Sequence, residues 1–182
     1  MSLNIELIEL VKKSISSEPL RFSLEASLEK TNDCGTIACI AGYTVIHSIG
    51  ILEALEQCTT SGNKPLWFPL KERAMAALRI DTEDANKLFL QSGWCEPYAS
   101  KYRDLSEEVD TLIWEDFGSI DLCDSDSGLP YSIQERIERS SLENDGHLTS
   151  TQVATEEKII ALKKEMADIT CQRIDHFVKT GE

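Results

Sequence analysis

The chain has 182 residues, 41% of them hydrophobic, which is enough for one globular domain with its own core. Its formal net charge of −14 argues against direct binding of nucleic acid, because contacts to phosphates depend on Lys and Arg. No apolar run reaches the ~20 residues of a membrane span, and no signal peptide is recognisable, so we expect a cytoplasmic protein that makes no membrane contact.

The six cysteines do not follow the spacing of a metal site. Only Cys34 and Cys39 lie close together, and no Cys-x-x-Cys pair occurs. Structural zinc sites usually contain two such tight pairs. We therefore expect reduced, mostly buried thiols, and neither a metal nor a cofactor.

The first predicted element is an amphipathic helix near the N-terminus. Ile5, Ile8, Val11 and Ile15 follow helical spacing. The helix is expected to end before Pro19, because the residue that precedes a proline is disfavoured in helical conformation. Residues 20–28 are expected to run extended, as a short hairpin arm.

The second predicted helix forms the centre of an all-α bundle. Residues 35–46 are apolar or small and carry no charge, and a helix that is apolar on every side is buried on every side. Asp33 is the expected N-cap. Cys34 would then stand at the start of this helix.

That position makes Cys34 a candidate nucleophile. A thiol at a helix N-terminus gains thiolate character, and "DCGTIAC" resembles the peptide around the nucleophile of SUMO-protease-type cysteine peptidases. However, His47 lies thirteen residues further along the same predicted helix, about 20 Å away. Only His147 and His176 could approach Cys34 through folding. A structural role for Cys34 is favoured, and a thiol-dependent hydrolase or redox protein is kept as an alternative.

The middle of the chain is predicted to contain a helix pair, residues 70–80 and 81–92, with Asp81 or Thr82 capping the second helix. The only basic residue of the second helix is Lys87, which argues against a DNA-recognition helix. Residues 93–104 are expected to form a loop in which Trp94 fills the core. A pocket between that loop and the central helix would suit a small-molecule sensor, which is a further alternative. Residues 105–117 then form a helix capped by Ser106.

The acidic loop at residues 118–130 has some features of a calcium-binding loop. Asp124, Asp126 and Glu135 fit positions one, three and twelve of an EF-hand. Leu129 occupies the sixth position, where glycine is needed for the turn, so we reject this interpretation.

The last predicted element is one long helix over residues 151–180, about 45 Å in length. Arg173 and His176 near its end are expected to complement the helix dipole. Because a small domain does not need so long a helix, a homodimer is possible. Its apolar stripe consists of Val153, Ile159, Leu162, Met166, Ile169, Ile174 and Phe177.

Four separate stretches resemble one protein family. They are "CGTIACIAG" (34–42), "AALRIDTEDANKLF" (76–89), "GWCEPYASKY" (93–102) and "RIDHFVKTGE" (173–182). The chain resembles small, mostly helical proteins of bacteria and their phages that have no established activity. The resemblance implies a helical fold but supplies no catalytic residues. It also implies that residues 104–146 are an insertion within a single domain.

The same stretch carries most of the charge. Residues 104–145 contain thirteen Asp and Glu against two Arg, which gives −11 of the total −14. The sequence therefore favours a non-enzymatic binding or regulatory protein whose acidic surface meets a basic partner protein, such as a nucleic-acid-binding protein that it inhibits. The expected partner-binding residues are Glu107, Glu108, Asp110, Glu115, Asp116, Asp121, Asp124 and Asp126.

Overall fold

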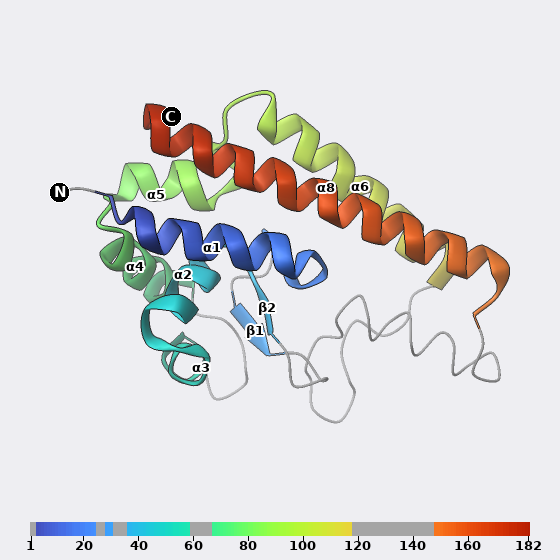
Figure 1. Cartoon of the computed structure of the whole chain (residues 1–182), viewed down its shortest axis with the longest axis horizontal. Coiled ribbons are helices and arrows are strands. Elements are labelled where there is room, and N and C mark those ends of the chain that lie inside the picture. Colours follow the sequence, from blue (N-terminus) through green and yellow to red (C-terminus); the bar gives the residue numbers. More distant parts are fainter. Residues whose placement is uncertain (1–2, 25–27, 31–35, 59–66, 118–147) are drawn as a thin grey trace.

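The computed structural model describes residues 3–24, 28–30, 36–58, 67–117 and 148–182, and it confirms the all-α class (Figure 1). The long helix α8 lies between α6 on one side and α1 on the other, while α2, α4 and α5 gather near the end of the molecule that holds both termini. The helices are α1 (Ile5–Ser17), α2 (Ile40–Ile49), α3 (Ile51–Cys58), α4 (Trp67–Leu78), α5 (Thr82–Phe89), α6 (Tyr98–Phe117) and α8 (Ser150–Thr180).

Helix α1 has the predicted amphipathic character. The Asn4 side chain caps it by accepting a hydrogen bond from the Leu7 amide at 3.2 Å, and it donates another to the Ala77 carbonyl of α4 at 3.1 Å. The cap therefore also fixes α1 to α4. The buried face consists of Leu7, Ile8, Val11 and Ile15.

The segment 35–46 differs from the prediction of one continuous helix. Residues Thr36–Ala38 form strand β2, which pairs antiparallel with β1 (Leu28–Lys30), and α2 begins only at Ile40. Of the expected extended arm, residues 20–28, only Leu28 lies in a strand and Phe22 makes an isolated bridge to Ala38, whereas the start of the arm belongs to a 3₁₀ turn, Pro19–Arg21. A short, uncharged, buried run is consistent with either a strand or a helix. The hydrophobic pattern of this segment therefore did not distinguish the two.

Helix α2 is buried over most of its length, as predicted, but it lies near the end of the molecule that holds both termini, against α1, α3 and α4, and not at the centre of the bundle (Figure 1). Residues 40–45 are all buried, and the Thr44 hydroxyl donates back to the Ile40 carbonyl at 2.8 Å, which satisfies this buried polar side chain. The helix ends at Gly50, whose φ of +87° suits a residue without a Cβ. Helix α3 follows directly.

The predicted pair α4 and α5 is confirmed with shifted bounds, since α4 ends at Leu78 and α5 already ends at Phe89. Helix α4 begins at Trp67 rather than at residue 70, so that Pro69 falls in its first turn, where proline is tolerated. The Asp81 side chain caps α5, accepting from the Asp84 amide at 3.0 Å.

Helix α6 begins earlier than predicted, at Tyr98, so the expected loop to residue 104 and the expected Ser106 cap are wrong. The Glu96 carboxylate accepts from the Ser100 amide at 3.3 Å and supplies the N-terminal cap instead. Asp104, the expected start of the insertion, lies within this continuous helix. Helix α6 packs along α8, and its buried residues are Tyr102, Val109 and Phe117.

Helix α8 confirms the predicted long helix. Thr149 and Gln152 form a reciprocal capping box at its start, and Gly181 ends it in left-handed conformation with a φ of +73°. The predicted apolar stripe is buried except for Val153, which stays 42% exposed.

The core role predicted for Trp94 is also confirmed. Its indole nitrogen donates to the Leu88 carbonyl at 3.2 Å, and its ring meets Tyr102 edge to face at 5.5 Å. The preceding Gly93 allows this approach, since a Cβ there would lie 2.3 Å from the Asn86 carbonyl oxygen.

Candidate interaction surface

The thiol at the start of α2 is Cys39, not Cys34. Cys34 and His147 both lie outside the described residues. Burial raises the pKa of Cys39 to about 11, although main-chain groups of Gly42, Ala41 and Cys39 itself act in the opposite direction. At this helix start, loss of hydration outweighs the helix dipole, and the thiol stays protonated at neutral pH.

The two described histidines have partners of their own. The Nε2 atom of His47 lies 2.7 Å from the Ser14 hydroxyl of α1, and burial lowers the pKa of His47. The ring of His176 lies against the ring of Tyr98, with 5.6 Å between the centroids. Both residues therefore connect helices of the core.

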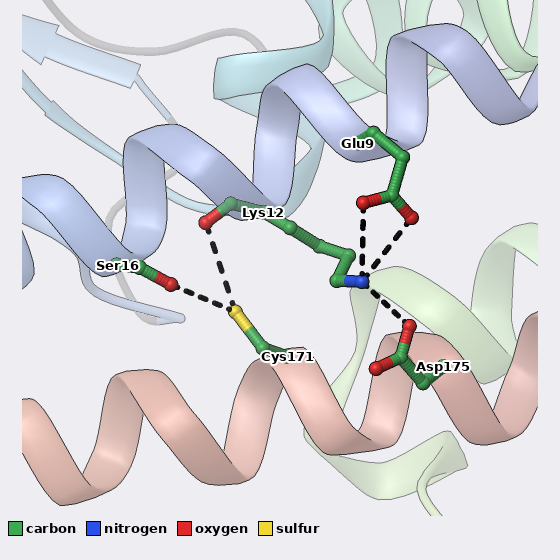
Figure 2. A network of polar contacts seen from close by, with 5 residues as sticks. All are labelled: Glu9, Lys12, Ser16, Cys171 and Asp175. Carbon is green, nitrogen blue, oxygen red and sulfur yellow. Dashed lines mark hydrogen bonds and ion pairs between the residues drawn. The ribbon is translucent and has the colours of Figure 1, made fainter.

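A polar cluster joins α1 to α8 (Figure 2). The Lys12 ammonium contacts Asp175 at 2.6 Å and Glu9 at 3.2 Å. Burial lowers the pKa of Lys12, but the hydrogen bonds that its ammonium donates to the two carboxylates, together with their negative charge, outweigh burial and raise this pKa above its ordinary value. Beside it, Cys171 lies 3.4 Å from the Ser16 hydroxyl, and burial raises the pKa of this thiol as well. The cluster connects two helices and contains no activated nucleophile.

Arg173 has a role that the sequence analysis missed. It is fully buried, and its guanidinium donates to the main-chain oxygens of Lys87 at 2.9 Å and Glu182 at 2.5 Å. Burial lowers the pKa of Arg173. The residue fixes the end of α8 to the last turn of α5. An arginine at the end of a helix gives no sign in sequence of whether it points outward or inward.

The predicted partner-binding residues separate into three groups. Asp121, Asp124 and Asp126 lie outside the described residues, as do the rejected calcium ligands. Glu108 pairs with Lys158 of α8 at 2.7 Å, and the half-buried Asp116 accepts a hydrogen bond from the Thr155 hydroxyl. These last two carboxylates help to hold α6 on α8.

The remaining three, Glu107, Asp110 and Glu115, are exposed. None of the ion pairs among the described residues involves them. Trp114 lies among them and is 68% exposed, which is unusual for so large an apolar side chain. We call Glu107, Asp110, Trp114 and Glu115 the α6 outer face. Part of the signal for it was present in the sequence, because helical spacing turns Glu107, Trp114 and Glu115 away from the buried Tyr102 and Val109, whereas Asp110 lies at the edge of the buried face.

The described part of the chain contains no group of three or more His, Cys, Asp or Glu arranged to hold a metal ion. None of its helices is long and apolar enough to cross a membrane. No protein-family model, curated protein or solved structure matches the chain. The family resemblance and the sensor hypothesis therefore stay predictions.

Proposed function

We propose that the protein is a non-enzymatic, cytoplasmic binding or regulatory protein that presents the α6 outer face to a basic protein surface. One observation carries the proposal. Glu107, Asp110 and Glu115 project from one rigid helix, exposed and without a cationic partner among the described residues, while nearby Glu108 and Asp116 have partners. Three carboxylates fixed on a helix can receive Lys and Arg side chains without first breaking internal ion pairs.

The proposed surface also suggests how the protein would act on its partner. A partner that binds nucleic acid carries a basic surface for phosphates, and a row of carboxylates on a helix can occupy that surface. The protein would then act as an inhibitor of such a partner. Association of this kind is fast at low ionic strength and weakens as salt is added.

A nona-lysine peptide tests the proposal by calorimetric titration at 25 and 300 mM NaCl. We expect salt-sensitive binding by the wild type and its loss in the triple variant Glu107→Lys, Asp110→Lys, Glu115→Lys. The matched control reverses three exposed carboxylates on other helices, Glu6→Lys, Glu56→Lys and Glu72→Lys, and so changes the net charge equally.

The comparison between the two triple variants decides the question. If the control variant loses binding as fully as the α6 variant, attraction depends on net charge alone and the proposed surface is wrong. Circular dichroism of both variants confirms that neither has unfolded.

A further inference from the structure

The position of Trp114 on α6 bears on what the outer face can bind. Asp110 precedes it by four residues and Glu107 by seven, so all three follow one stripe along the helix. Long side chains on a helix lean toward its N-terminus, which brings the indole of Trp114 over the turn that holds Asp110. A flat apolar ring and a carboxylate thus share one patch of exposed surface.

This combination restricts the chemistry of the occupant. A purely apolar partner would cover the indole but would also strip water from the carboxylates without replacing their hydrogen bonds. Phosphates and anionic lipid headgroups would be repelled by Glu107 and Asp110. A lysine ammonium satisfies a carboxylate as a compact point charge, whereas a guanidinium is planar, so it can stack on the indole and donate to a carboxylate at once.

We propose that Trp114 and Asp110 form a binding site for an arginine side chain of a basic protein segment, with Trp114 as the anchor. This inference rests on the proposed function and adds the identity of the side chain that is recognised. Charge complementarity favours a basic segment, and the exposed ring favours arginine over lysine within it. Tryptophan and arginine are also the residues most often found as anchors at protein interfaces.

The test compares nona-arginine with nona-lysine, which carry the same charge, by calorimetric titration at 100 mM NaCl. We expect the wild type to bind nona-arginine roughly 5-fold more tightly, since a cation stacked on a ring contributes about 1 kcal/mol. Trp114→Ala should remove most of this preference, so that the two peptides bind with similar affinity. The affinity for nona-lysine should change little. Phe68→Ala is the matched control, because Phe68 is a 77% exposed aromatic residue on α4.

The outcomes separate the two proposals. An unchanged arginine preference in Trp114→Ala, with binding still lost in the α6 triple variant, would overturn the arginine site and leave the acidic surface standing. Absence of binding to either peptide at 25 mM NaCl would overturn both. Adsorption of the wild type, but not of Trp114→Ala, to phosphatidylcholine vesicles without peptide selectivity would assign Trp114 to a lipid surface and overturn the arginine site.

Discussion

Arg173 brings a positive charge into the interior, where its guanidinium meets main-chain oxygens of Lys87 and Glu182. Its Nε atom is buried without a hydrogen-bond partner among the described residues. The ring of Phe177 lies 5.9 Å from the guanidinium carbon and offers a further favourable contact. The residue is therefore a structural link between α5 and the end of α8 rather than a surface cation.

We predict that Arg173→Lys destabilises the protein by about 1–3 kcal/mol, because one ammonium cannot reproduce the fork that reaches both acceptors. The free energy of unfolding in urea measures the change. The control is Lys179→Arg at an exposed position of the same helix. An unfolding midpoint of Arg173→Lys equal to that of the wild type would show that the two hydrogen bonds of the guanidinium do not contribute to stability.

His47 makes stability depend on pH. Burial lowers its pKa in the folded state below the ordinary value of 6.5, so the unfolded chain binds a proton more readily than the folded protein. The contribution of His47 is therefore fully present above pH 6.5 and is lost as pH falls from 6.5 toward the folded-state pKa. We expect the stability difference between wild type and His47→Gln to shift against the wild type across this window.

Urea unfolding at intervals from pH 7.5 to pH 5 measures this difference. The glutamine amide can still bond to Ser14, so any constant offset between the curves reflects packing. If stability depends on pH in the same way in the wild type and in His47→Gln, the lowered pKa of His47 is not the cause of the pH dependence.

At the scale of secondary-structure elements, burial rather than ion pairing holds α8 in place. Ile159 and Ile174 of this helix are fully buried, whereas Asp175, which pairs with Lys12 of α1, is 46% exposed at its side chain. Exposed ion pairs contribute little, because water screens them and ordering two long side chains is unfavourable.

We therefore predict a large difference between two neighbouring substitutions. Ile174→Ala should destabilise the protein by about 2–5 kcal/mol, through lost burial and the cavity that remains. Asp175→Asn should change stability by less than about 1 kcal/mol. Chemical denaturation of both variants measures the difference, and similar losses would mean that the polar cluster of Figure 2 contributes more than its exposure suggests.

The elements also show how far sequence reasoning reached. Periodic helices such as α1 and α8, and the Asp81 cap, were predictable because their signals are local. Strand β2 was not, since its pairing with β1 involves a separate segment of the chain. The start of α6 was missed because Pro97 and Tyr98 suggested a loop, while the cap comes from Glu96.

For the whole molecule, the acidic charge was visible in the sequence but its arrangement was not. Composition alone treated Glu107 and Glu108 alike, although the first is exposed without an ion pair in the described structure and the second binds Lys158. Likewise, the insertion expected from Asp104 onward begins within α6, whose inner side shares the core with α8. Only the fold divides these carboxylates into those that hold helices together and those that face outward.

The central claim is that the α6 outer face is the surface that a basic partner meets. The most direct measurement is the change of backbone amide NMR shifts on addition of nona-arginine. We predict that the largest changes fall on residues 103–115 of α6 and include the indole N–H of Trp114. Changes concentrated instead around the exposed Leu52 and Phe68 of α3 and α4 would contradict the claim.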